Sequence, residues 1–315
     1  MCAGMYSDEL SSNHSKPIET IFHSKILLIY FQTTKACDVC GCSIGNGFSA
    51  ILPQFQKNFV GIRTTLSNFE SNSIHTPYSK NKESSVSIEL WTRIYLHKKI
   101  QLIASLPYNF NTQIESNLTH HINGLGDAVA LINYSIINRN QDSLKWKHLL
   151  LVGVGLKLPT GKFLVSTNNS EPIIGLQTGT GSLDYLYNLI YTIRHNRWGS
   201  YNQVQYQYNL ANKVKYEFGN KLNIHSKVFY WHTLKNASNL LPSFGVSIDK
   251  VAKDYKEGYV QSQTGGFVNS LTLGCDWYYK SYLFSCNYYQ PIYQNLGEGT
   301  ITAKNKLQIT ASLLF

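Results

Sequence analysis

The stretch VSIELWTRIYL, residues 86 to 96, decides the fold class because its apolar and polar side chains alternate throughout. One face carries Val86, Ile88, Leu90, Thr92, Ile94 and Leu96, and the other carries Ser87, Glu89, Trp91, Arg93 and Tyr95. A period of two is that of a β-strand, in which successive side chains point to opposite faces. A Glu and an Arg on the inner face fit a water-filled interior better than a dry core.

The same pattern returns in two later segments. Val204, Tyr206, Tyr208 and Leu210 alternate with Gln203, Gln205, Gln207 and Asn209. A row of amides would leave unpaired polar groups in a dry core, and a wet lumen removes that cost. The last segment alternates up to Phe315, and a closing aromatic resembles the signal that the barrel-assembly machinery reads in outer-membrane proteins.

About twelve such segments are predicted as strands, and most run for about 9–13 residues, enough to cross a bilayer at a tilt. They lie near 57–66, 84–96, 99–107, 126–138, 146–158, 182–194, 199–211, 220–232, 241–250, 266–279, 281–291 and 304–315. The turns near Lys98, Arg197 and Lys280 are short. The connections predicted as long, polar loops are 67–83, 108–125, 159–181, 251–265 and 292–303.

These features predict an all-β fold, a transmembrane antiparallel β-barrel with short periplasmic turns and long extracellular loops. A soluble sandwich or lipocalin-like barrel would explain the alternation, but not the strand length, the 22 tyrosines or the final Phe315. The even strand number puts both chain ends on the periplasmic rim.

The composition agrees with a membrane surface. Only 15% of the 315 residues are charged, against about 25% in an average soluble domain. The net charge of +10 favours anionic partners. No Lys/Arg run or basic-aromatic helix accompanies it, so we expect no nucleic-acid partner.

The first 56 residues form two further predicted segments. The short apolar run 26–31 follows Lys25 and precedes Ala36, which resembles a secretory signal. About 20 polar residues precede that run, which is unusual for a signal, so residues 1–36 are a signal peptide or an N-terminal extension. Residues 37–56 are a cysteine-containing periplasmic or plug segment, and 57–315 form the barrel.

Cys37, Cys40 and Cys42 open the second segment. Three readings stay open: a disulfide or free thiols in an oxidising periplasm, a lipid anchor on Cys37, or a site for a metal or a partner. Three thiolates suit Cu(I) or part of a zinc site; no other cofactor is expected. The plug candidates Phe48, Ile51, Leu52 and Phe55 could enter the lumen or lie across the rim.

Three glycine-rich motifs occupy the middle of the chain: GLGD at 124–127, LKLPTGK at 156–162 and TGTGSLD at 178–184. Their chemistry suits barrel corners, where Asp caps a turn, Pro ends a strand and Gly permits positive φ. They could also shape a solute entrance. The residues concerned are Gly124, Gly126, Asp127, Pro159, Thr160, Gly161, Gly179, Gly181 and Asp184.

The order of these motifs resembles the outer-membrane transporter family named after the MetA pathway of phenol degradation, over roughly residues 57–315. The resemblance implies a barrel in the bacterial outer membrane that moves small solutes, with aromatic or apolar compounds as one option. It implies no catalytic residues.

The expected lumen carries charged, amide and aromatic side chains. Mixed charges would constrict a pore and favour small polar or zwitterionic solutes, or they would fill a narrow barrel with satisfied hydrogen bonds. The candidates are Glu89, Trp91, Arg93, Tyr95, Gln203, Gln205, Gln207, His225 and Lys227.

Other reactive side chains give weaker patterns. His120 and His121 are adjacent in a predicted loop and read as exposed histidines more readily than as metal ligands. Cys275 and Cys286 flank the turn at Lys280 symmetrically, so they could form a disulfide or serve as small apolar wall residues. No catalytic spacing such as G-x-S-x-G or H-E-x-x-H occurs, so no enzyme is expected.

The sequence therefore predicts a passive outer-membrane channel whose partners are outer-membrane lipid, small solutes and the barrel-assembly machinery. The alternative is a structural or docking barrel whose N-terminal cysteines bind a metal or a periplasmic partner.

Overall fold

The computed structural model describes residues 57–72, 80–115, 118–139, 145–166, 172–234 and 238–315. The predicted segments 1–36 and 37–56 lie outside these ranges, and so do the plug candidates and Cys37, Cys40 and Cys42. Every statement below concerns the described residues.

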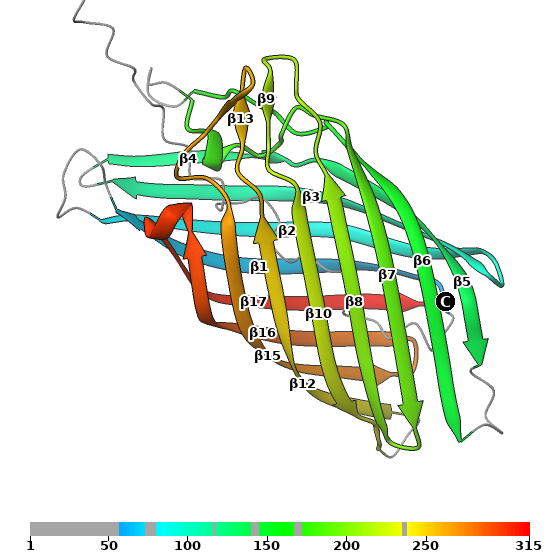
Figure 1. Cartoon of the computed structure of the whole chain (residues 1–315). Coiled ribbons are helices and arrows are strands. Elements are labelled where there is room, and N and C mark those ends of the chain that lie inside the picture. Colours follow the sequence, from blue (N-terminus) through cyan, green and yellow to red (C-terminus); the bar gives the residue numbers. More distant parts are fainter. Residues whose placement is uncertain (1–56, 73–79, 116–117, 140–144, 167–171, 235–237) are drawn as a thin grey trace, which may run out of the picture. The chain divides into compact units, whose positions relative to one another are not determined.

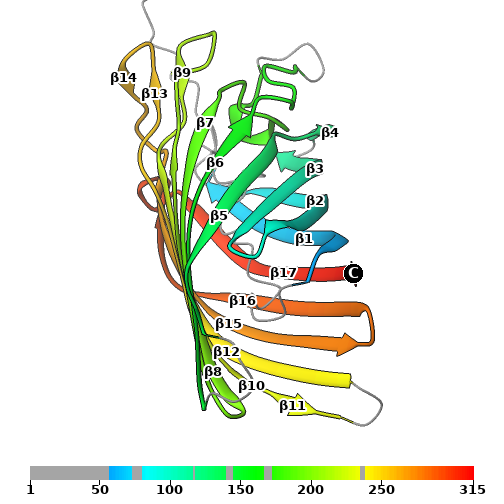
Figure 2. The same cartoon turned by 90° about the vertical axis from the view of Figure 1, so that its right-hand side faces the viewer.

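Twelve antiparallel strands close into a barrel (Figures 1 and 2). In ring order they are β1 (Phe59–Asn72), β2 (Lys80–His97), β3 (Ile100–Glu115), β5 (Ala128–Arg139), β6 (Trp146–Leu158), β7 (Asp184–His195), β8 (Trp198–Tyr208), β10 (Lys221–Tyr230), β12 (Ser238–Val251), β15 (Gly266–Tyr279), β16 (Tyr282–Leu296) and β17 (Ile301–Leu314). Pairing of β1 with β17 closes the ring. The predicted fold class is confirmed.

A further strand, β4 (Leu118–Leu125), continues into β5 as one interrupted strand along β3. Residues 108–115 of β3 pair with β4, and residues 100–105 pair with β5. The interruption falls at Gly126 and Asp127, opposite Pro107, which has no N–H for the ladder. The Gly126 amide donates to the Pro107 carbonyl at 2.8 Å, so the chain stays attached to β3 while it changes direction.

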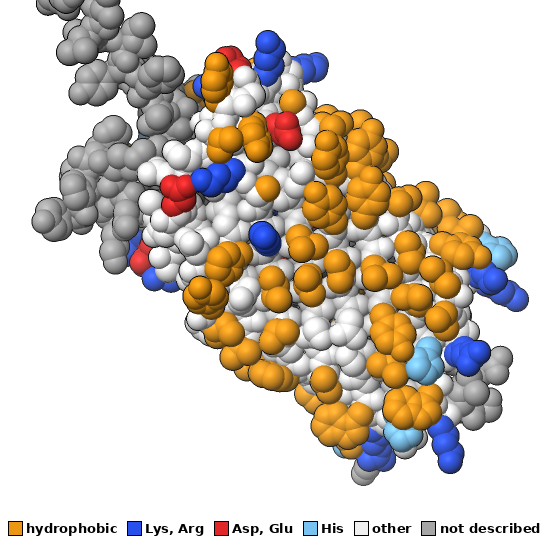
Figure 3. Space-filling view, in the orientation of Figure 1, with side chains coloured by type: hydrophobic (Ala, Val, Ile, Leu, Met, Phe, Trp, Pro, Cys, Tyr) orange, Lys and Arg blue, Asp and Glu red, His pale blue; other side chains and the backbone are white. Residues whose placement is uncertain are grey.

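The outer face of the barrel is apolar. Exposed side chains include Ile62, Leu90, Val154, Phe244 and Leu273, and hydrophobic atoms cover much of the side of the barrel in Figure 3. An apolar belt around a closed barrel is the architecture of bacterial outer-membrane proteins. We therefore place the chain in a bacterial outer membrane, as predicted.

The inner face divides into two halves. Toward the long loops it is polar, with buried charged and amide side chains. Toward the short turns, each of the twelve ring strands contributes at least one member to a buried cluster that we call the apolar ring. Its members are Phe59, Trp91, Ile103, Leu131, Leu149, Leu151, Leu186, Ile190, Tyr201, Phe229, Leu241, Tyr278, Leu283 and Leu314.

Three of the predicted long loops are wrong, because strands continue through most of 67–83, 108–125 and 292–303. β1 and β2 extend to Asn72 and Lys80, and β16 and β17 to Leu296 and Ile301. In these outer extensions both faces can be polar, so the apolar alternation fades while the ladder of hydrogen bonds continues. The remaining boundaries shift by a few residues; β8, for example, ends at Tyr208 and not at 211.

The predicted loops 159–181 and 251–265 remain as long connections, between β6 and β7 and between β12 and β15. The first contains a 3-10 turn, η2 (Ile174–Leu176). A second such turn, η3 (Gly297–Gly299), lies in the short connection between β16 and β17. A small sheet joins β9 (Tyr216–Glu217), β13 (Tyr255–Lys256) and β14 (Tyr259–Val260), while β11 (His232–Thr233) pairs with β12. No helix within the described ranges is long and apolar enough to cross a membrane.

Candidate functional site in the barrel interior

The second arm of the β6–β7 loop lies against the inner wall of the barrel. Asn109 and Asn111, on the inner face of β3, donate to the carbonyls of Thr178 at 3.3 Å and Leu176 at 2.9 Å. Gln177 is buried and joins the two arms, since its amide accepts from the Val165 N–H at 2.8 Å and donates to the Val165 carbonyl at 3.1 Å. The loop therefore narrows the lumen.

Asp127 fixes this loop at both ends. Its Oδ1 accepts from the Gly161 amide at 3.0 Å. Its Oδ2 accepts from the Thr180 amide at 2.9 Å and from the Thr180 hydroxyl at 2.7 Å. One carboxylate at the β4–β5 interruption thus joins the start and the end of the loop to the barrel wall.

Gly161 and Gly179 make this convergence sterically possible. A Cβ at Gly161 would lie 2.6 Å from the Gly179 Cα, and a Cβ at Gly179 would lie 2.5 Å from the Gly161 carbonyl carbon. No real side chain tolerates such contacts, so the two loop arms touch backbone to backbone. Thr160 adds a third tie, because its hydroxyl donates to the Gly126 carbonyl at 2.8 Å.

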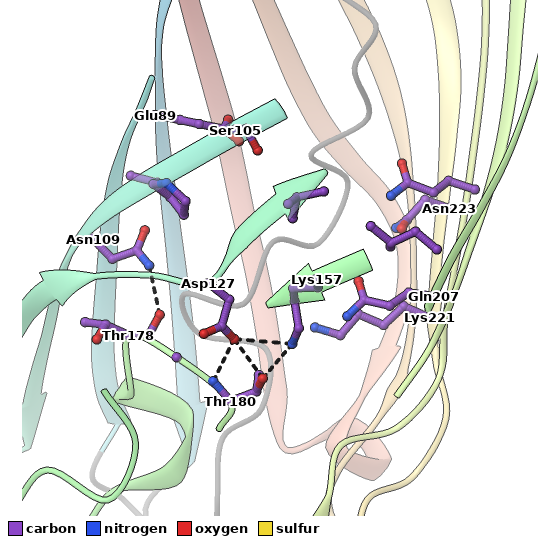
Figure 4. Close-up of a pocket in the computed structure, with 16 residues that line it drawn as sticks. Glu89, Ser105, Asn109, Asp127, Lys157, Thr178, Thr180, Gln207, Lys221 and Asn223 are labelled. Atoms are coloured by element: carbon purple, nitrogen blue, oxygen red, sulfur yellow. Dashed lines mark hydrogen bonds and ion pairs between the residues drawn. The ribbon is translucent and has the colours of Figure 1, made fainter. Parts of the chain in front are cut away.

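We call the contacts among Asp127, Thr160, Gly161, Gly179 and Thr180 the latch. Lys157 connects the latch to the neighbouring strand, β7. Its Nζ donates to the Thr180 hydroxyl at 2.6 Å, lies 3.4 Å from Asp127 Oδ2 and forms an ion pair with Asp184. Figure 4 shows Asp127, Lys157 and Thr180 converging at the cavity wall. Asp184 is fully buried and also accepts from Ser182 at 2.9 Å. Two carboxylates thus enclose one ammonium group.

A cavity of about 810 Å³, counted with the solvent space that opens from it, lies beside this network. Most of the lining is polar and comes from strands on both sides of the lumen (Figure 4). It consists of Ser87, Glu89, Ser105, Pro107, Asn109, Asp127, Val129, Lys157, Thr178, Gly179, Thr180, Leu186, Gln205, Gln207, Lys221 and Asn223.

Other inner-face charges and amides are joined to one another. Arg63 Nε donates to Glu89 Oε2 at 2.6 Å, so the carboxylate that faces the cavity has a buried counter-ion. Gln203 accepts from the Tyr201 hydroxyl at 2.9 Å and donates to Asn188 at 2.8 Å. The inner wall is therefore a preorganised polar surface.

The predicted lumen candidates lie on the inner face. Tyr95 and Gln205 are partly buried and the other seven are buried, namely Glu89, Trp91, Arg93, Gln203, Gln207, His225 and Lys227. Lys227 lies 5.6 Å above the Tyr201 ring, and the His225 ring meets the Tyr289 ring edge-on at 6.2 Å. Their contact with a solute stays a prediction.

The three sequence motifs come together in space. Gly126, Asp127, Thr160, Gly161, Gly179 and Asp184 belong to the latch or adjoin it. Gly124 faces Thr178, where a Cβ would have an ordinary 3.5 Å contact, and Gly181 adopts a positive φ of 69°. Pro159 follows the last residue of β6. Nothing in the sequence pattern indicates that Lys157, inside the second motif, joins two carboxylates.

The histidines lie elsewhere than predicted, whereas Cys275 and Cys286 face each other across the hairpin as expected. His120 and His121 lie in β4 and not in a loop; His120 is buried, and His121 Nδ1 lies 2.9 Å from the Thr112 hydroxyl. Cys275 and Cys286 are directly opposed in the β15–β16 register and are free thiols. Within the described ranges, no group of three or more His, Cys, Asp or Glu is placed to hold a metal.

Solved structures with a similar fold are outer-membrane barrels. An outer-membrane channel from Pseudomonas putida F1 aligns with a TM-score of 0.61 at 12% identity, covering 87% of this chain and 100% of that one. The β domain of the Bordetella autotransporter BrkA gives 0.48 at 12% identity, with 82% and 99% covered. The NanC porin gives 0.42 at 11%, with 80% and 98% covered.

No family model and no curated protein matches the chain. At 12% identity the first of these structures shows the fold alone. The outer-membrane barrel fold agrees with the resemblance seen in the motifs, and membership of that particular transporter family stays a prediction.

Proposed function

We propose that the chain is a passive outer-membrane channel for small solutes. One observation carries the proposal: the interior of a closed barrel contains a cavity, about 810 Å³ together with the open solvent space that adjoins it, between charged and amide side chains. A water-filled passage lowers the cost of placing many charged and amide side chains inside a barrel, because a polar group that lacks both water and a hydrogen-bond partner costs free energy. We assign no enzymatic role.

The charge arrangement supports selection by size and polarity. Glu89 with Arg63 on one side of the cavity and Lys157 with Asp127 on another place both signs of charge on the wall. Fixed charges of both signs favour small polar or zwitterionic solutes that can replace lost water contacts. The inward β6–β7 loop adds a steric limit. The motif resemblance adds aromatic and apolar compounds to the candidate solutes of this proposal.

Liposome swelling tests the proposal directly. Full-length barrel reconstituted in liposomes should admit amino acids and small sugars, with rates that fall steeply as solute size increases. Protein unfolded before reconstitution is the control for lipid leakage. A correctly folded barrel that gives no swelling with any solute would contradict the channel and favour a structural role.

A further inference from the structure

Arg93 is a buried cation that has no carboxylate partner among the described residues. It is 3% exposed. Its Nε and Nη2 donate to the Lys57 carbonyl at 3.3 and 3.0 Å. Its guanidinium lies 5.1 Å from the Phe59 ring centre and 5.4 Å from that of Tyr95. A carbonyl and two ring faces stabilise a cation without neutralising it.

Two other cations of the inner wall are neutralised by acids. Arg63 forms an ion pair with Glu89, and Lys157 forms ion pairs with Asp127 and Asp184. A buried charge that lacks such a counter-ion costs several kcal/mol in general. Arg93 therefore places in the inner wall a positive charge that no acidic side chain among the described residues neutralises.

The surroundings of Arg93 restrict which anion fits. Arg93 lies on the inner face of β2 two residues from Trp91, and its register partners are Phe59 on β1 and Ile103 on β3. All three neighbours belong to the apolar ring. A small hydrated ion would lose water there without replacement, whereas an organic anion with an apolar body buries that body while its carboxylate meets the guanidinium.

The position of Arg93 also fits a transit site. The apolar ring draws members from every ring strand and all of them are buried, so it narrows the barrel interior on the short-turn side of the polar cavity, which one member, Leu186, also lines. A solute that crosses the barrel has to pass this level. A fixed cation within a hydrophobic constriction lowers the barrier for an anion more than for its neutral analogue.

We propose that Arg93 forms a carboxylate-binding site within the apolar ring and makes the channel selective for small organic acids with an apolar, aromatic-sized body. The proposal rests on the channel function proposed above and adds selection at the apolar ring to the selection made by the polar cavity. Arg93 binds the carboxylate, and Phe59, Trp91 and Ile103 contact the apolar body. No covalent step is involved.

The test compares benzoate with its neutral analogue benzamide in proteoliposomes containing the full-length barrel. Arg93→Gln should lower the initial uptake rate of benzoate at low concentration by about tenfold, as expected for one lost charged hydrogen-bonding partner, and change benzamide uptake by less than about twofold. Arg93→Lys should keep part of the benzoate preference. Lys99→Gln, which removes an exposed turn charge, should match the wild type.

Equal losses of benzoate and benzamide uptake in Arg93→Gln would overturn the inference, because they would indicate a structural role. Unchanged benzoate uptake in a folded variant would overturn it as well. Sugars and amino acids are measured in the same liposomes: if the wild type passes these but shows no Arg93-dependent benzoate preference, only the site fails. If it passes no solute at all, the channel itself fails.

Discussion

At the scale of single residues, Asp127 makes the contacts that attach both ends of the β6–β7 loop to the inner wall. Its two oxygens accept three hydrogen bonds from Gly161 and Thr180 and lie beside Lys157. Each bond joins the β6–β7 loop to the wall. The position of the loop therefore depends on this carboxylate together with the bonds from Asn109, Asn111 and Thr160.

Replacing Asp127 by Asn tests this dependence. The amide nitrogen cannot accept, and Lys157 loses one of two acidic partners, so the free energy of unfolding should fall by about 3 kcal/mol, near the lower end for a broken buried pair. Urea titration in detergent measures the loss. In liposomes the variant should admit larger sugars than the wild type.

Glu298→Gln is the matched control, because it removes a carboxylate from an exposed pair with Lys253, and such pairs contribute less than about 1 kcal/mol. If Asp127→Asn left both the stability and the size limit at the wild-type values, the latch would have no function.

The contact between Gly161 and Gly179 gives a second residue-scale prediction. Gly161→Ala forces a methyl group to within 2.6 Å of the Gly179 backbone, and the loop arms must separate, at a cost of about 1–3 kcal/mol. The midpoint of thermal unfolding should fall. Gly124→Ala, where the nearest atom would be 3.5 Å away, should unfold near the wild-type temperature; equal losses in both variants would contradict the close approach.

At the scale of strands, the register follows from alternation but the strand ends do not. The segment 86–96 predicts its inner face because one face is apolar. Beyond the apolar belt the contrast between an apolar and a polar face disappears. The sequence therefore predicts a loop in the outer half of the β3–β4 hairpin, which holds His120 and His121. Pairing there depends on backbone hydrogen bonds, which side-chain patterns do not reveal.

The apolar ring likewise could not be predicted from the side-chain pattern of any one strand. Trp91 stands between Glu89 and Arg93, and Tyr201 precedes Gln203 by one inner-face position. Even in β6, where Leu149 and Leu151 are successive inner positions, Lys147 and Lys157 share the same face, so the sequence predicts a wet lumen throughout. The ring exists only because the register of twelve strands brings one or two such side chains per strand to the same level. The latch likewise needs Asp127 and Thr180, 53 residues apart.

Cys275 and Cys286 allow a direct test of the β15–β16 register. Directly opposed residues of an antiparallel pair have Cα atoms about 4.5–5.5 Å apart, within the range that a disulfide spans. Mild oxidation of the folded barrel should therefore join these two thiols, and mass spectrometry of the linked peptides should detect the bond.

Moving one thiol supplies the control. The double variant Cys286→Ser with Ser285→Cys places the second thiol on the inner face, since Ser285 is buried and faces Asp276, and should not cross-link with Cys275. Efficient linkage of 275 to 285, and none to 286, would mean that the register is shifted by one residue.

At the scale of the whole molecule, the barrel has two different rims. The short turns carry the exposed cations Lys98, Lys99, Arg197 and Lys280, and stacked aromatic rings such as Trp146 with His195 lie beside them. The opposite rim mixes signs, as in the Lys253–Glu298 and Lys304–Glu70 pairs. Between the rims lies the apolar belt, so the surface has the layers of a bilayer with its two interfaces.

The belt predicts where a charge is tolerated. Leu90 lies in the belt and is 55% exposed, so Leu90→Arg should destabilise the lipid-embedded barrel by about 2–4 kcal/mol, measured by urea unfolding in vesicles. Leu118, 61% exposed next to the β3–β4 turn, lies outside the belt, and Leu118→Arg should change the stability far less. The reverse order would place the membrane around a different part of the barrel.

The central claim is that the closed, polar-lined barrel conducts. Single-channel recording of the full-length protein in a planar bilayer tests it most directly. The structure predicts discrete current steps that rise linearly with voltage and shrink when solutes small enough to enter the cavity are added. A folded, inserted barrel that produces no steps above the lipid baseline, at either polarity and in high salt, would contradict the claim.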